Sequence, residues 1–171
     1  SPLFLTNPTK PQQTLVLVYP FLERLLEEAR ALGMSLKILS AYRSFEEQTA
    51  IKDSYSVTYG AGTANSFSAD QGYSEHQLGT TIDFTTSKIG SATLDFAKTK
   101  EYEWLLKNAY KHGFILSYPE NNPSYIFEPW HWRFVGVSLA KRLFEEKQDF
   151  YTLEQRQIDA YLVDLFESTV E

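Results

Sequence analysis

The sequence has no cysteine among its 171 residues, and it has few basic residues and few histidines. The lack of cysteine excludes disulfide bonds and metal sites built from thiolates, although it leaves the compartment open, because extracellular proteins can also lack cysteine. Sixteen lysines and arginines stand against 22 aspartates and glutamates, which gives a formal net charge of −6. Proteins that bind nucleic acid need a basic surface, so nucleic acid is not the expected partner.

Long apolar runs are also missing. No run approaches the roughly 18 residues of a membrane-spanning helix, so we expect no membrane span in this chain. The first residues, Ser1-Pro2-Leu3-Phe4, lack the charged region and the long apolar region of a signal peptide. We therefore expect no targeting signal in this chain.

The local patterns predict one domain over residues 1–171, a length that can bury its own core. Ser44 and Glu47 have the spacing of a capping box at the start of a helix. Helices and short strands alternate without a βαβ rhythm, so we expect an α+β fold with a small, mostly antiparallel sheet. Residues 1–14 are expected to be an irregular arm and 58–73 a surface loop. The spacing predicts helices over 20–32, 45–56, 100–112, 137–147 and 152–166, and strands over 36–39, 80–85, 114–116 and 132–135.

Two of the three histidines lie in short segments that also contain acids. The first segment carries His76 and Asp83, and the second carries Glu128 and His131. Two imidazoles and one carboxylate form a zinc site with an open fourth position, which is typical of a catalytic metal; other divalent metals also accept such ligands. Glu128 is then free to act as a general base. The third histidine, His112, closes a predicted helix, where its charge would suit the helix dipole.

These segments resemble a known family. The patterns Ser-x-His-x-x-Gly-x-x-x-Asp (74–83) and Glu-x-x-His (128–131) are similar to those of the zinc D-alanyl-D-alanine carboxypeptidases of the VanY type. The L,D-carboxypeptidases of the LdcB type are equally similar. Segments 40–48, 102–118 and 128–136 also match, and the resemblance runs from about residue 15 to 145. Beyond it, residues 148–171 are expected to form a peripheral C-terminal helix.

The resemblance implies a role for each matched residue. It implies that Arg43 grips the free carboxylate of the substrate, and that Gln48 and Ser74 are further substrate contacts. Thr81 departs from the family, which usually has a small residue there, and its hydroxyl would need a partner if buried. The resemblance implies that His76, Asp83 and His131 bind Zn²⁺ in a single site within a groove. It also implies that Glu128 is the base that activates water.

The resemblance therefore predicts a zinc peptidase that removes the terminal D-alanine from a peptidoglycan stem peptide with a free carboxyl end. It also implies a location in the cell envelope or outside the cell. A peptidoglycan endopeptidase on the same scaffold is an alternative, although Arg43 favours an enzyme that acts at a chain end. A non-catalytic zinc-containing binding module is another, although such a module would not need Glu128. The sequence leaves D,D- against L,D-specificity, the role in resistance or wall remodelling, and the oligomeric state open.

Overall fold

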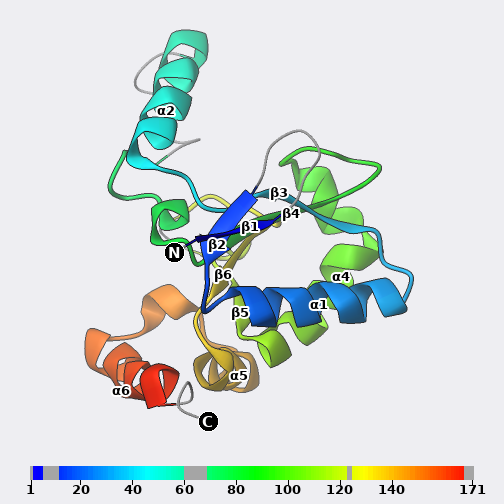
Figure 1. Cartoon of the computed structure of the whole chain (residues 1–171), viewed down its shortest axis with the longest axis vertical. Coiled ribbons are helices and arrows are strands. Elements are labelled where there is room, and N and C mark those ends of the chain that lie inside the picture. The colour runs from blue at the N-terminus through cyan, green and yellow to red at the C-terminus, as the bar shows by residue number, and fades with distance from the viewer. Residues whose placement is uncertain (1, 6–11, 60–68, 123–124, 168–171) are drawn as a thin grey trace.

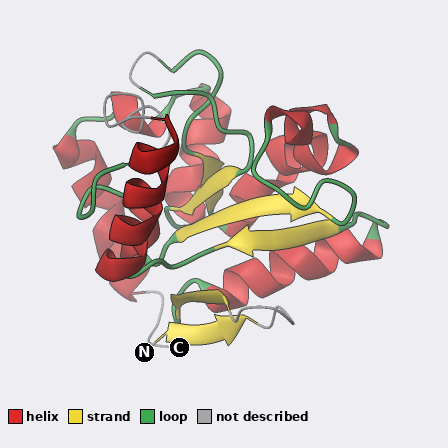
Figure 2. Cartoon of the chain, turned by 90° about the horizontal axis from the view of Figure 1, so that it is seen from above, coloured by secondary structure: helices red, strands yellow, loops and turns green. Residues whose placement is uncertain are grey.

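A four-stranded antiparallel sheet lies at the centre of the chain, with helices around it (Figures 1 and 2). The computed structural model describes all residues except 1, 6–11, 60–68, 123–124 and 168–171. The order of the strands in the sheet is β3-β4-β6-β5, and the α+β expectation is confirmed. The strands are β3 (Leu36–Ser40), β4 (Thr81–Thr86), β5 (Phe114–Leu116) and β6 (His131–Phe134).

Strand β4 is buried along its whole length, as expected of a central strand rich in β-branched residues. Alternate side chains of a strand point to opposite faces of the sheet. Ile82 and Phe84 therefore share one face, where both are fully buried in the main hydrophobic core. Asp83 and its neighbours two residues away point to the other face. The apolar face of β4 anchors the strand, and the polar face is available for a site.

Two amphipathic helices cover this core. Helix α1 (Tyr19–Ala31) buries Leu22 and Leu25, and helix α4 (Lys100–Asn108) buries Leu105. Burying a leucine side chain stabilises the fold by roughly 1.5–3 kcal/mol. A short 3₁₀ helix, η3 (Ala109–His112), continues α4 and ends at Gly113 with φ +81°. A Cβ atom on Gly113 would lie 2.5 Å from the Phe134 ring, so both the backbone conformation and the packing require glycine there.

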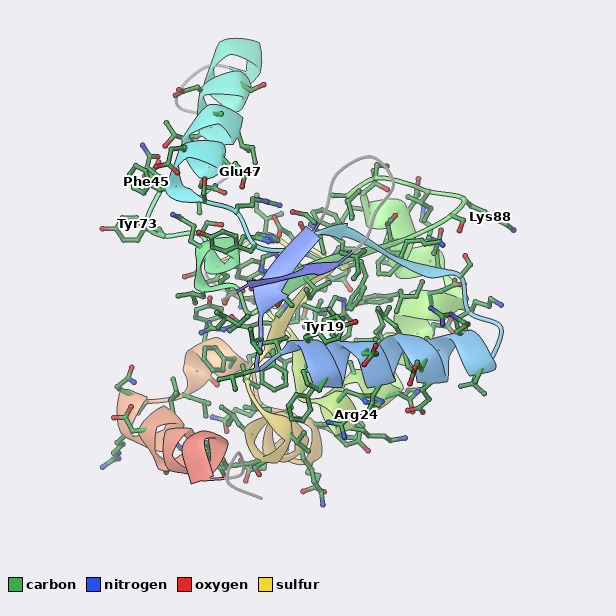
Figure 3. All side chains as sticks on the ribbon, viewed as in Figure 1. Tyr19, Arg24, Phe45, Glu47, Tyr73 and Lys88 are labelled. Carbon is green, nitrogen blue, oxygen red and sulfur yellow. The ribbon has the colours of Figure 1, made fainter. Side chains whose placement is uncertain are left out.

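The predicted capping box forms at the start of helix α2 (Phe45–Tyr59). The backbone N–H of Glu47 donates to Ser44 Oγ at 3.1 Å, and the Ser44 N–H donates to Glu47 Oε2 at 3.0 Å. Glu47 therefore lies at the base of α2, and the helix extends away from the sheet (Figures 1 and 3). α2 is longer than predicted and takes in the start of the expected loop over 58–73, of which 60–68 lie outside the described residues.

The N-terminal residues correct the expectation of an irregular arm. Strands β1 (Pro2–Leu5) and β2 (Gln12–Leu15) pair antiparallel, with Leu5 opposite Gln12. The end of β2 is held by the segment that contains His76: Thr14 Oγ1 and the Leu15 N–H donate to the Gly79 carbonyl oxygen at 2.8 and 3.0 Å. This contact spans 65 positions, so the local sequence pattern could not reveal it.

The C-terminal part contains helix α5 (Val137–Glu146), a 3₁₀ turn η4 (Phe150–Thr152) and helix α6 (Gln155–Glu167). The remaining 3₁₀ helices, η1 (Glu75–Leu78) and η2 (Leu94–Lys98), flank β4 in the sequence. No helix in the described ranges combines the length and apolarity that crossing a membrane would require.

Candidate metal centre

Three elements bring the predicted metal ligands together. His76 lies on η1, Asp83 lies in the middle of β4, and His131 begins β6. Asp83 and His131 face each other across the β4–β6 pair. Gly79, with φ +70°, ends η1 and turns the chain into β4. One ligand atom of each residue lies within 4.8 Å of the others, so a single ion could contact all three.

In each imidazole, one nitrogen contacts a protein group outside the predicted ligand set, and the other nitrogen faces Asp83. His76 Nδ1 contacts the Ala41 carbonyl oxygen, and His76 Nε2 lies 3.1 Å from Asp83 Oδ2. His131 Nε2 lies 2.8 Å from Glu75 Oε2, and His131 Nδ1 lies 3.3 Å from Asp83 Oδ1. The two rings meet edge to face with their centroids 5.0 Å apart. Histidines that bind metals are oriented in this way by a partner at the distal nitrogen.

The ionised carboxylate of Asp83 also fits a divalent cation, whereas His131 must release a proton before it can bind one. Burial opposes the ionisation of Asp83, but His76 and His131 outweigh it and hold the pKa of Asp83 well below its usual range. Burial would lower the pKa of His131, but hydrogen bonds to Asp83 and Glu75 raise it to about 9. Asp83 Oδ1 is buried and lies 3.3 Å from His131 Nδ1. Two nitrogens and one carboxylate oxygen form a donor set that suits zinc.

Glu128 lies beside these three residues. Its Oε2 atom is 3.5 Å from His131 Nδ1, and a quarter of its side chain is exposed. A turn fixes the backbone of Glu128 relative to His131, because the His131 N–H donates to the Glu128 carbonyl oxygen at 3.1 Å. Burial raises the pKa of Glu128 to about 6, with a smaller opposing effect of His131. A carboxyl group with this pKa can accept and return a proton near neutral pH.

The three predicted substrate residues differ from one another in their contacts and surroundings. Arg43 follows β3 and reaches the centre: its Nη2 atom lies 2.9 Å from Asp83 Oδ2, and its Nε donates to Ser40 Oγ at 3.1 Å. Gln48 is buried, and its amide donates to the Ala69 carbonyl oxygen at 2.8 Å. Ser74 is buried immediately before η1. Only Arg43 among them is joined to a metal-ligand side chain by a described contact, and the roles of all three in substrate binding stay predictions.

Sequence reasoning missed Glu75, although it stands inside the first motif. It is 5% exposed, and its two oxygens bind different partners. Oε2 contacts His131, whereas Oε1 accepts hydrogen bonds from Arg133 Nη1 at 2.7 Å and from the Tyr151 hydroxyl. The signal available in the sequence was an acidic residue directly beside a ligand. Its partner, however, is 56 positions away.

Tyr118 is a second residue that the sequence did not single out. Its ring stacks on His131 with centroids 4.6 Å apart. Tyr125 and Tyr151 continue this aromatic cluster, since the centroids of Tyr118 and Tyr125 are 4.8 Å apart, as are those of Tyr125 and Tyr151. Aromatic rings therefore cover the His131 side of the centre.

Residues 16–137 match the sequence model of the VanY family, described as D-alanyl-D-alanine carboxypeptidase. The chain belongs to this family. Among curated relatives, the putative carboxypeptidase YodJ of Bacillus subtilis is 36% identical to this chain over 124 residues. The aligned region covers 70% of this chain and 45% of YodJ. The chain thus spans about half the length of this relative.

Solved structures of the VanY family share the fold. VanYB in complex with D-alanine-D-alanine is 29% identical, with a TM-score of 0.76, and the match covers 95% of this chain and 87% of VanYB. A mutant VanY D,D-pentapeptidase from the VanB-type resistance cassette, in complex with Zn(II), is 28% identical, with a TM-score of 0.75 and coverage of 95% and 89%. The LdcB LD-carboxypeptidase is 31% identical, with a TM-score of 0.75 and coverage of 85% and 70%. The resemblance to both VanY and LdcB is therefore confirmed.

Proposed function

We propose that this chain is a zinc-dependent carboxypeptidase that hydrolyses the terminal D-alanine from peptidoglycan stem peptides. The observation that carries the proposal is the buried group of His76, Asp83 and His131, with Glu128 and Arg43 beside it. The family supports a carboxypeptidase reaction, and the Zn(II) complex of VanY supports the choice of metal. The D-alanine-D-alanine complex of VanYB supports the choice of substrate.

In the proposed reaction His76, Asp83 and His131 hold Zn²⁺. When bound, Zn²⁺ lowers the pKa of a water molecule to about 7 and polarises the scissile carbonyl group. Glu128 takes a proton from the attacking water as the new C–O bond forms. It then delivers that proton to the departing amine as the C–N bond breaks. The products are the shortened peptide, which ends in a carboxylate, and free D-alanine.

Arg43 gives the proposed enzyme its preference for a chain end. A guanidinium can bind a carboxylate through two parallel hydrogen bonds, which fixes direction as well as affinity. In the structure the Nη2 group of Arg43 donates a hydrogen bond to Asp83, and its Nε group donates one to Ser40. Because the guanidinium group is planar and rigid, these two hydrogen bonds also fix the directions of its other N–H groups. We propose Gln48 and Ser74 as further substrate contacts, and a location in the cell envelope or outside the cell, where peptidoglycan lies.

The test is mass spectrometry of zinc-loaded protein incubated with matched tetrapeptide and pentapeptide stem substrates. Loss of one alanine from the tetrapeptide would identify an L,D-carboxypeptidase, and loss from the pentapeptide alone a D,D-carboxypeptidase. Cleavage of internal cross-links without release of alanine would identify an endopeptidase and overturn the proposal. Zinc binding without any cleavage would favour a binding module.

The matched control is Glu128→Gln, which keeps the shape of the side chain but cannot take up the proton. We expect this variant to bind zinc, because Glu128 is outside the ligand group, and to lose about 10²–10⁴-fold in kcat. Full activity in the variant would show that another group acts as the base.

A further inference from the structure

The distal nitrogen of His131 is connected to the C-terminal part of the chain by a short series of hydrogen bonds. His131 Nε2 contacts Glu75 Oε2 at 2.8 Å, and the other Glu75 oxygen accepts the Tyr151 hydroxyl. Arg133 Nη1 donates to that same oxygen at 2.7 Å. Both oxygens of one buried carboxylate are thus engaged, and its orientation follows from these partners.

Tyr151 lies on η4, after the residues that match the family model, which end at 137. Its ring is held independently of the hydroxyl. It packs against Tyr125, with centroids 4.8 Å apart, and edge to face against Phe150, with centroids 5.5 Å apart. The guanidinium of Arg133 lies over the Phe150 ring, 4.6 Å from its centroid. Both donors to the Glu75 oxygen are therefore fixed by the turn that contains η4.

The orientation of Glu75 matters because His131 must present Nδ1, not Nε2, toward Asp83. A histidine that presents one nitrogen to a metal needs a partner that holds the other. Glu75 is that partner. If Glu75 rotated away, His131 would lose the contact that selects its tautomer and ring orientation. The hydroxyl of Tyr151 and the guanidinium of Arg133 are the contacts that oppose this rotation.

We infer that Tyr151 is a positioning residue of the metal centre: it holds Glu75, and Glu75 orients His131. The segment 148–153, expected from the sequence to be peripheral, thereby forms part of the centre. This inference rests on the proposed function only in that the His76–Asp83–His131 group binds zinc. It requires no particular peptide substrate.

The test compares Tyr151→Phe with Tyr161→Phe. The first variant keeps the ring contacts and removes the hydroxyl that binds Glu75. The second removes a hydroxyl of the same C-terminal region that accepts a hydrogen bond from Arg142 at 3.4 Å and is remote from Glu75 in the hydrogen-bond network. Zinc affinity is measured by competition with a chromophoric chelator, and the visible spectrum of the Co(II)-loaded protein reports the ligand geometry. Thermal unfolding of the metal-free proteins controls for stability.

Loss of a direct partner of a metal ligand costs about 10–100-fold in metal affinity. We expect that loss for Glu75→Gln, and a smaller one, about 3–10-fold, for Tyr151→Phe, which acts through Glu75. We also expect an altered Co(II) spectrum for Tyr151→Phe and none of these changes for Tyr161→Phe. Because Tyr151→Phe keeps its packing, it should fold even if Glu75→Gln does not.

Unchanged affinity and an unchanged Co(II) spectrum in Tyr151→Phe would overturn the inference while leaving the proposed function intact. Equal losses in Tyr151→Phe and Tyr161→Phe would also overturn it, because the effect would then reflect general destabilisation. A wild-type protein that binds no zinc would instead refute the proposed function, and the inference with it.

Discussion

Replacing Thr81 by valine should stabilise this protein. Thr81 is fully buried in β4, and its hydroxyl has no hydrogen-bond partner among the described residues. An unsatisfied buried polar group costs about 1–3 kcal/mol. Valine has nearly the same shape, so the substitution removes the hydroxyl without leaving a cavity. We expect the free energy of unfolding to rise by about 1 kcal/mol and Tm by about 2–4 °C.

Thr85 provides a matched control on the same strand and the same face. It is also buried, but its hydroxyl donates to the Ser91 carbonyl oxygen at 3.2 Å. Thr85→Val removes that hydrogen bond and should lower the free energy of unfolding by about 0.5–1 kcal/mol. The two variants carry the same chemical change, so only the hydrogen bond distinguishes their expected effects.

Urea denaturation and calorimetry of both variants measure the difference. The proteins are compared in excess chelator, because a metal bound to the folded state adds its own stabilisation. The reasoning is refuted if Thr81→Val loses as much stability as Thr85→Val, since the Thr81 hydroxyl must then be making a favourable contact.

Two further predictions concern the metal centre. Arg43→Lys should raise KM for a stem peptide with a free carboxyl end more than it lowers kcat, because lysine cannot form the paired hydrogen bonds; steady-state kinetics should show the reverse split if Arg43 serves only to hold Asp83. Since Asp83 and Glu75 raise the pKa of His131 to about 9, metal-free His131 is protonated at neutral pH and the metal must displace that proton. Zinc affinity should therefore rise about tenfold per pH unit between about pH 6 and 8, and an affinity independent of pH would show that His131 is already neutral.

The elements that the sequence predicted well are those set by local patterns. The apolar period of α1 and the β-branched run of β4 reflect which side chains can be buried in a helix or a strand. The capping box at Ser44 and Glu47 involves residues only three positions apart. The candidate ligands His76, Asp83 and His131 came from the scarcity of histidine, with three in the chain, together with the resemblance of the two histidine segments to the VanY family.

Contacts between segments that are distant in the sequence could not be predicted from local patterns. The docking of Thr14 on Gly79 depends on a contact across 65 positions. The hydrogen bond from Tyr151 to Glu75 crosses 76 positions. Residue types alone do not reveal such partners, because many tyrosines and glutamates in the chain are chemically equivalent.

The sequence by itself thus determined which side chains could bind a metal and which could move a proton, since these properties belong to the residue types. The tertiary structure alone decided which imidazole nitrogen faces Asp83. It also decided that Glu75, rather than another acid, holds His131, and that Arg43 lies against Asp83. The physical reason is that a ring orientation is set by the partner at its far side, and that partner is brought there only when the strands pair.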